Sequence, residues 1–350
     1  MAKKNGATFL GIGIALVVIG LFGGLVALPI AVSMNVDHHR PYNGDESESV
    51  EIITPYDNNT LPEFPDVGTN AGGPEADDGE LHDARNIDVS YQFQEGFWAE
   101  SHTEHLKAYD MDVNCEFAVK YPVLLGDLEH LDAINALLRS TAMETVHTYY
   151  EDPSADAVNM VKKTTEGSSD FLTSGADAYL MSKVDYAITY NNENLISVCY
   201  SDDYCIGSMM AEFVELRTVN INLQTGEAYV LDDALTVTED IATSFVDNLV
   251  QTSGTDANKD GVITDDECST VAIAGRKALV EAVQGKGELA GRRIRTCLFV
   301  DGNGKPNLGV NYWVSADDAF VRGWWDVTIT DEQLEKARKD CELWNLLSGK

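Results

Sequence analysis

The chain has 350 residues, of which 58 are Asp or Glu and 24 are Lys or Arg, so its formal net charge is −34. This acidic excess argues against binding to nucleic acid, which needs clustered Lys and Arg to displace counterions from phosphates. It disfavours peripheral binding to anionic lipid for the same reason. Apolar residues make up 44% of the chain, which is close to the usual globular share and predicts a folded core.

An uncharged apolar run lies near the start of the chain. Residues 7–34 contain no charged side chain, follow Lys3 and Lys4, and precede an acidic stretch that begins at Asp37. About 20 apolar residues suffice to cross a bilayer, so the run predicts a transmembrane anchor. The two lysines place residues 1–6 in the cytoplasm and everything after the anchor outside. A cleaved signal peptide is the competing interpretation, although its apolar region normally spans only about 7–15 residues.

Residues 35–88 have a different composition. From Asp37 to Asp88 there are 14 Asp and Glu against Arg40 and Arg85, together with five of the nine prolines. Such acidic, Pro- and Gly-rich sequence has few large apolar side chains and cannot offset its ordering entropy by burial. We therefore expect a disordered tether that holds residues 89–350 away from the membrane as one extracellular domain.

From Val89 onward the sequence alternates between strand and helix patterns. Alternating apolar residues predict a strand over 108–125, and apolar residues at three- and four-residue spacing predict a helix from 128 to about 150. Strands are expected at 178–190, 195–200, 214–223 and 228–231, helices at 239–251 and 265–284, strands at 295–300, 308–314 and 322–329, and a closing helix at 331–347. This order predicts an α+β fold with a largely antiparallel sheet and packed helices, preceded by the single N-terminal transmembrane helix.

Six cysteines follow the predicted anchor: Cys115, Cys199, Cys205, Cys268, Cys297 and Cys341. Neither CxxC nor a Cys–His zinc spacing occurs, and an oxidising exterior favours disulfides. The pairing of six thiols cannot be read from sequence, so the connectivity stays open. The closest two, Cys199 and Cys205, flank a polar segment that would suit a hairpin tip closed by a disulfide.

The most specific motif is typical of an EF-hand calcium loop and covers residues 256–267. The expected ligands are Asp256, Asn258, Asp260, the Val262 carbonyl, Thr264 and Glu267. Gly261 allows the sharp turn, and Ile263 occupies the apolar position that joins such a loop to the core. Calcium takes about six to eight oxygen ligands, so we expect a calcium ion here as a structural staple rather than a sensor. An accidental acidic turn is the alternative.

The common motifs for catalysis are absent from the sequence. The sequence contains no GxSxG, no HExxH and no Walker or dinucleotide-binding glycine pattern. His102-Thr103-Glu104-His105 combines two imidazoles with a carboxylate, a weak metal pattern that surface histidines explain more simply. Trp324 and Trp325 indicate core packing more than a sugar-binding platform, although alternation along a strand would expose one of them.

Several short segments occur in a characteristic order: Val119 to Leu124, a helix containing Ile134 to Leu138, Val184 to Ile188, Leu195 to Val198, Val219 to Glu227 with its Thr-Gly turn, and late strands within 310–329. In this order they resemble the RsiV-type extracellular domain family, which includes lysozyme-sensing anti-sigma factors and a domain beside peptidoglycan deacetylases. The resemblance implies an α+β domain that binds in the bacterial cell envelope. Three features depart from the family: no His in 205–211, a cytoplasmic tip too short for a sigma factor, and the inserted calcium loop.

Two functions from different classes follow. The first is a calcium-stabilised recognition module, anchored in the bacterial cell membrane by one helix, that binds an envelope polymer or a cationic host protein such as lysozyme. Its acidic charge would attract a basic partner. The second is a cell-wall hydrolase, or another carbohydrate-active enzyme of the envelope, whose catalytic acids cannot be distinguished among so many carboxylates. The ligand and the oligomeric state are not encoded in any pattern that we recognise.

Overall fold

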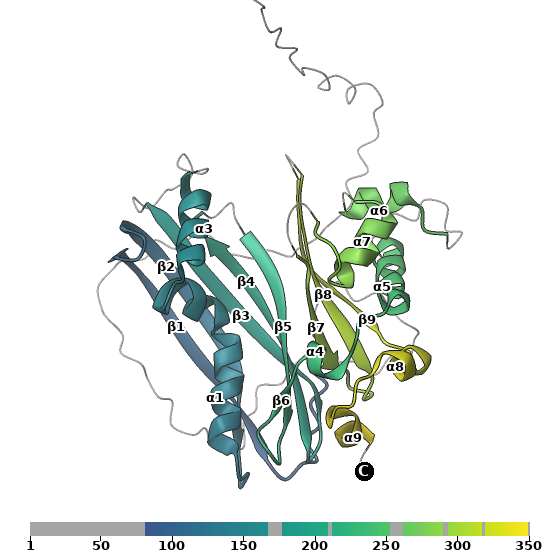
Figure 1. Cartoon of the computed structure of the whole chain (residues 1–350). Coiled ribbons are helices and arrows are strands. Elements are labelled where there is room, and N and C mark those ends of the chain that lie inside the picture. Colours follow the sequence, from purple (N-terminus) through teal and green to yellow (C-terminus); the bar gives the residue numbers. More distant parts are fainter. Residues whose placement is uncertain are drawn as a thin grey trace, which may run out of the picture. The chain divides into compact units, whose positions relative to one another are not determined.

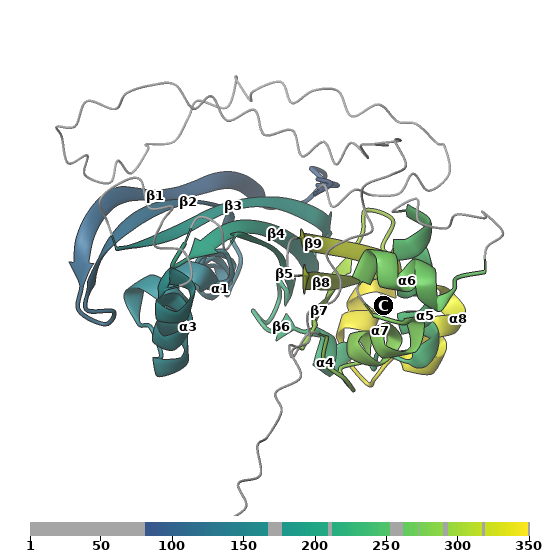
Figure 2. The same ribbon diagram turned by 90° about the horizontal axis from the view of Figure 1, so that it is seen from above.

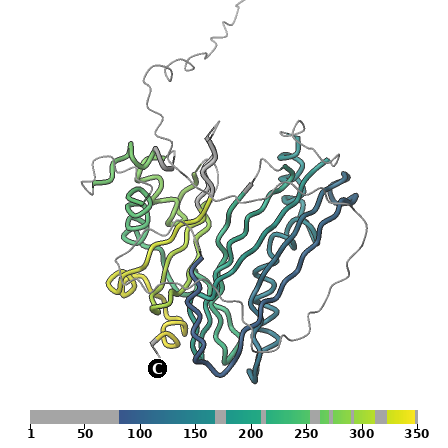
Figure 3. Tube along the Cα trace, turned by 180° about the vertical axis from the view of Figure 1, so that it is seen from behind, coloured from purple at the N-terminus to yellow at the C-terminus, as the bar shows by residue number. Residues whose placement is uncertain are grey.

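The larger of two sheets has six strands in the order β1-β2-β3-β4-β5-β6. In the computed structural model these are β1 Gln92–Leu106, β2 Met111–Leu125, β3 Ala178–Asn191, β4 Leu195–Ile206, β5 Glu212–Asn222 and β6 Ala228–Tyr229. Neighbours are antiparallel except β2 and β3, which run parallel because the chain crosses over between them through helices. Figure 1 shows β1 at one edge of this sheet, and Figure 3 shows the strands from behind.

The structure describes residues 81–166, 177–208, 212–252, 262–272, 274–289, 293–316 and 319–348. The predicted anchor at 7–34 and the predicted tether up to residue 80 lie outside these ranges. No helix within them is both long enough and apolar enough to span a membrane. The segment 81–88, which we assigned to the tether, contacts β3: the Ala84 amide donates to the Ile188 carbonyl over 3.0 Å, and the Asn86 amide donates to Asn191 Oδ1 over 2.6 Å.

The crossover helices cover one face of the six-stranded sheet (Figure 2). They are α1 Leu131–Ala142, α2 Glu144–Val146, the π-helical turn η1 His147–Glu151 and α3 Ala155–Glu166. The buried residues of α1, Ile134, Leu138 and Ala142, recur at four-residue spacing and so share one helix face. They pack with the inward-facing residues of β2, which are Val113, Cys115, Phe117 and Val119. The alternation that predicted β2 therefore marks the side chains that hold α1 against the sheet.

The smaller sheet is antiparallel, in the order β7-β8-β9. Its strands are β7 Arg295–Val300, β8 Pro306–Ala316 and β9 Ala319–Thr328, and the accompanying helices are α4 Leu231–Ala234, α5 Glu239–Thr252, α6 Asp265–Ala272, α7 Arg276–Val283, α8 Asp331–Ala337 and α9 Leu343–Ser348. Phe245 of α5, Leu279 of α7 and Leu308 of β8 are fully buried in one apolar cluster. The helices and the smaller sheet thus share a second core.

The two sheets meet on the other face of β4 and β5. An apolar cluster at this contact contains four buried residues: Cys199, Leu216, Phe299 and Trp324. Polar side chains of β5 also reach across, because Thr218 Oγ1 and Asn220 Nδ2 both donate to the Leu298 carbonyl, over 2.9 and 2.8 Å. The contact is therefore partly apolar and partly hydrogen-bonded.

Asn311 of β8 also joins the sheets. Its Oδ1 accepts from the Leu216 amide over 2.6 Å, and its Nδ2 donates to the Leu216 carbonyl over 2.8 Å. Asn311→Ala leaves both backbone groups unpaired, so we expect it to lower the free energy of unfolding by about 1 kcal/mol in urea denaturation. Asn303→Ala, in the exposed turn before β8, is the control and should change it by less than about 0.5 kcal/mol. Equal losses would show that the Asn311 amide does not stabilise the contact.

The predicted α+β class, with a large and mainly antiparallel sheet and packed helices, is confirmed. The strand β1 and the helix α3 were not predicted, and β4 continues to Ile206, beyond the predicted end at 200. As an edge strand, β1 alternates only between exposed and half-buried residues, so its apolar signal is weak.

Three predicted helices are divided in the structure, and the first of them, expected from 128 to about 150, is present as α1, α2 and η1. The helix expected over 265–284 is broken before α7, where the Arg276 amide donates to Asp265 Oδ1 over 2.9 Å and Gly275 has extended backbone angles. The helix expected over 331–347 ends at Arg338, which is extended and forms a β-bridge with Leu235. The break before α7 depends on a contact within the predicted helix itself, and the break at Arg338 depends on a contact with a residue about a hundred positions away.

Candidate metal sites

The predicted calcium loop is only partly described. Asp256, Asn258 and Asp260 lie outside the described residues, whereas Val262, Thr264 and Glu267 lie inside them. Helix α5 ends at Thr252 and α6 begins at Asp265, so the loop connects two helices as the motif expects. Ile263 packs against the apolar cluster that contains Phe245, which is the contact expected of its position in the loop.

Glu267 points back toward the loop. Its side chain is buried, and Oε2 accepts hydrogen bonds from the Thr264 amide over 2.9 Å and from Thr264 Oγ1 over 2.8 Å. The Glu267 amide in turn faces Thr264 Oγ1 at 3.3 Å. This Thr-x-x-Glu arrangement is a helix capping box, which satisfies amides at the start of α6. In this orientation the Glu267 carboxylate caps helix α6 and also points toward the end of the predicted calcium loop.

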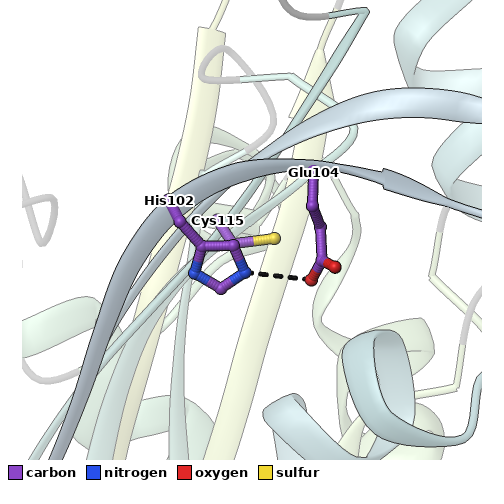
Figure 4. Close-up of side chains that lie close together, drawn as sticks. All are labelled: His102, Glu104 and Cys115. Carbon is purple, nitrogen blue, oxygen red and sulfur yellow. Dashed lines mark hydrogen bonds and ion pairs between the residues drawn. The ribbon is translucent and has the colours of Figure 1, made fainter. Parts of the chain in front are cut away.

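A second group of metal-ligating side chains lies on the β1–β2 hairpin. His102 and Glu104 come from β1 and Cys115 from β2, and one ligand atom of each lies within 4.8 Å of the others. Figure 4 shows the imidazole facing the Glu104 carboxylate, with the Cys115 thiol beside them. His102 Nε2 and Glu104 Oε1 are 2.9 Å apart. The Tyr150 hydroxyl of η1 donates to the same carboxylate oxygen over 2.8 Å.

The sequence indicated the wrong second histidine for this group. Strand alternation turns His105 to the opposite face of β1, where its Nδ1 lies 3.0 Å from Asp112 Oδ1. The residue that joins His102 is Cys115, its direct partner in the antiparallel register. A prediction of strand β1 and of its hairpin with β2 would have revealed this pair, because the hairpin register places the His102 and Cys115 side chains on one face.

The electrostatics of this group argue against a nucleophilic thiol. Cys115 is fully buried, and this burial, followed by the charges of Glu104 and Glu100, raises the pKa of its thiol to about 12. Hydrogen bonds from His102 and then Tyr150 lower the pKa of the Glu104 carboxyl. A catalytic cysteine needs the reverse environment, one that favours the thiolate at neutral pH. The donor set is suited instead to a metal ion, which expels the thiol proton when it binds.

The hairpin-tip disulfide expected between Cys199 and Cys205 is wrong. Both residues lie on β4, where Cys199 pairs with Thr218 and Cys205 with Glu212. At about 3.3 Å per strand residue their Cα atoms are about 20 Å apart, far beyond the roughly 7 Å that a disulfide spans. All six cysteines are present as thiols.

The aromatic pair on β9 belongs to the core. Trp324 is buried in the contact between the sheets, and its Nε1 donates to Ser201 Oγ over 3.2 Å. Trp325, on the other face of β9, is half-buried against the cluster that contains Phe245. The expectation that one of the two is exposed is wrong, because both faces of the smaller sheet are covered at this position.

Together these features define an α+β protein with a large, mainly antiparallel sheet. A crystal structure of a DUF3298 family member from Bacteroides fragilis is similar to this chain, with 14% identity and a TM-score of 0.40, covering 75% of this chain and 100% of that chain. A DUF3298 family protein from Pseudomonas aeruginosa is similar with 10% identity and a TM-score of 0.33, covering 71% and 95%. No protein-family model and no curated protein matches the chain.

Proposed function

We propose that this chain is a calcium-stabilised recognition module, anchored by residues 7–34 outside a bacterial cell, that binds a cationic protein of the lysozyme type. The observation that carries the proposal is the charge of the folded part. From Val89 onward there are 44 Asp and Glu against 20 Lys and Arg. The apolar run, the acidic segment after it and the resemblance to RsiV-type domains support a location in the cell envelope.

Many basic side chains of the folded part are already engaged with carboxylates. Among the described residues from Val89 onward, eight of them form ion pairs: Lys120, Lys183, Arg217, Arg276, Lys277, Arg295, Lys305 and Lys336. Arg295 contacts both Glu144 and Glu215, over 3.0 and 2.7 Å. Because acids outnumber bases about two to one, this pairing still leaves an excess of carboxylates at the surface.

One acidic surface stands out, formed by α4, the start of α5 and α8. Its exposed carboxylates are Asp232, Asp233, Glu239, Asp240, Asp331, Glu332 and Glu335, its bases are Lys336, Arg338 and Lys339, and Lys305 pairs with Asp331 over 2.7 Å. The helices adjoin, because the Thr236 amide donates to the Ala337 carbonyl over 2.9 Å and Gln333 Nε2 donates to Ser244 Oγ over 2.8 Å. Seven carboxylates against these four bases leave the surface with a net negative charge, which attracts a cationic partner.

We expect lysozyme, in calcium, to bind the full-length protein in detergent, with an association rate that falls as salt rises. Salt screens exposed charges beyond about 8 Å at physiological ionic strength. The triple variant Asp232→Asn, Asp240→Asn, Glu335→Gln should lower the association rate constant about threefold to tenfold in biolayer interferometry at low salt.

A second triple variant provides the control. Asp127→Asn, Glu129→Gln and Asp132→Asn remove the same charge from exposed positions just before and in the first turn of α1, and should change the rate less than the first variant does. An equal decrease of the association rate constant in both triple variants would contradict the proposed role of the acidic surface. If the protein were retained by purified cell-wall fragments but did not bind lysozyme, the proposal that its partner is a cationic protein would be overturned.

A further inference from the structure

We propose that His102, Glu104 and Cys115 form a binding site for a transition-metal ion of the zinc class, separate from the calcium loop. Their imidazole nitrogen, carboxylate oxygen and thiol sulfur lie within 4.8 Å of one another (Figure 4). The site is independent of the proposed recognition of a cationic protein, so either proposal can fail alone.

The hairpin itself assembles the site. In the antiparallel register His102 lies directly opposite Cys115, and directly opposed residues project from the same face of the sheet. Glu104, two residues after His102, shares that face by strand alternation. The register is held by the turn between β1 and β2, where the Tyr109 and Asp110 amides both donate to the Leu106 carbonyl, over 3.0 and 2.9 Å.

The mixed donor set selects the class of metal. Zinc binds Cys sulfur at about 2.3 Å and His nitrogen or carboxylate oxygen at about 2.0–2.2 Å, whereas calcium and magnesium prefer oxygen ligands throughout. Tetrahedral ligands at those bond lengths are about 3.3–3.8 Å apart. His102 Nε2 and Glu104 Oε1 are 2.9 Å apart, so small rotations of these side chains would admit the ion.

The surroundings add the features of a metal site. The Tyr150 hydroxyl donates to Glu104 Oε1 over 2.8 Å and so orients one of the ligands. Glu100 lies on the same face of β1, and its Oε2 is buried with no hydrogen-bond partner among the described residues. A second carboxylate on this face, with an unsatisfied buried oxygen, favours a divalent cation electrostatically.

The site is also accessible to an ion from solvent. The side chains of His102 and Glu104 are 36% and 40% exposed, whereas Cys115 is fully buried beneath them. An ion can therefore reach the imidazole and carboxylate directly, while the thiolate that completes the set stays shielded from water. Three protein ligands leave one coordination position for water, in contrast to closed structural zinc sites with four protein ligands.

Cobalt(II) titration of the full-length protein in saturating calcium tests the site. We expect one equivalent to bind with a thiolate-to-cobalt charge-transfer band, and zinc to displace it because thiolate ligands select zinc. Cys115→Ser should abolish the band. Tyr150→Phe should weaken binding about tenfold, the usual effect of losing an orienting partner, and His102→Gln, which removes a ligand, should weaken it more.

Two matched controls use the neighbouring histidine and another cysteine. His105→Gln, which alters the opposite face of β1, and Cys341→Ser, which alters a half-buried thiol, should leave the band and affinity unchanged. X-ray absorption of the zinc-loaded wild type needs no variant and should show one sulfur at about 2.3 Å. The proposal is overturned if that sulfur is missing, if no band forms, or if the band persists in Cys115→Ser.

Discussion

Replacing Arg217 by Met is expected to lower the free energy of unfolding by about 3–5 kcal/mol, because it leaves a buried carboxylate without its cation. Arg217 is 4% exposed, and its partner Asp202 is 0% exposed. The guanidinium contacts Asp202 Oδ2 directly. Thr145 Oγ1 and Ser182 Oγ donate to the two oxygens of the same carboxylate, over 2.6 and 2.8 Å.

Several acids surround the Arg217 guanidinium and favour its charged form. Burial lowers the pKa of Arg217, but the charges of Asp202, Glu215 and Glu144 outweigh it, and the net pKa is raised. Without Arg217, two hydroxyl groups alone would face the Asp202 carboxylate. The desolvation of that carboxylate would then be uncompensated, which is the usual reason for a large loss at a buried ion pair.

Urea denaturation followed by circular dichroism measures this loss, with Arg276→Met as the matched control. Arg276 pairs with Asp247 over 2.7 Å, but both side chains are 34% exposed, so its loss should cost at most about 1 kcal/mol. The double variant Arg217→Met, Asp202→Leu removes both charges and should recover much of the stability. A loss for Arg217→Met no greater than for Arg276→Met would show that the buried pair is not stabilised by its ionic contact.

Glu267→Gln is expected to lower the melting temperature by about 3–10 °C in 10 mM calcium and to change it little in chelator. A site of about 0.1–1 mM affinity contributes about 1.4–2.7 kcal/mol at that concentration. A protein of this size loses roughly 2–4 °C per kcal/mol. Gln removes the charge that calcium requires but keeps a carbonyl oxygen that can accept from the Thr264 amide, as Glu267 does over 2.9 Å.

Differential scanning calorimetry with and without calcium separates the two roles of Glu267. Asp266→Asn is the control, because it removes the same charge from the adjacent residue at a loop position that supplies no ligand in the EF-hand pattern. The change of melting temperature caused by Asp266→Asn should be the same in calcium and in chelator. Equal destabilisation by Glu267→Gln in both conditions would refute the calcium site and leave helix capping as the role of this residue.

Most elements could be predicted because their information is local. Apolar alternation marked β2 and β3, and three- and four-residue spacing marked α5 within a few residues of its observed ends and the start of α1, although α1 ends at Ala142 and not near 150. The predicted calcium loop is also local, since all its ligands fall within residues 256–267. Each of these patterns reflects side chains that share a face of one element.

Features created by pairing between distant segments could not be predicted in the same way. Alternation between exposed and half-buried residues hid β1, and with it the register that joins His102 to Cys115. The position of Trp325 depends on the helices that cover β9, because those helices remove the exposed face that strand alternation predicts.

The sequence alone therefore determined the α+β class, most of the strands and helices, and the acidic character, because each follows from residue type and spacing along the chain. The tertiary structure decided which side chains meet. It placed Cys199 and Cys205 far apart on one strand, paired Arg217 with the buried Asp202, and brought Cys115 beside His102. Such contacts depend on strand register and on how sheets and helices pack. The spacing of residues along the chain does not determine either of these.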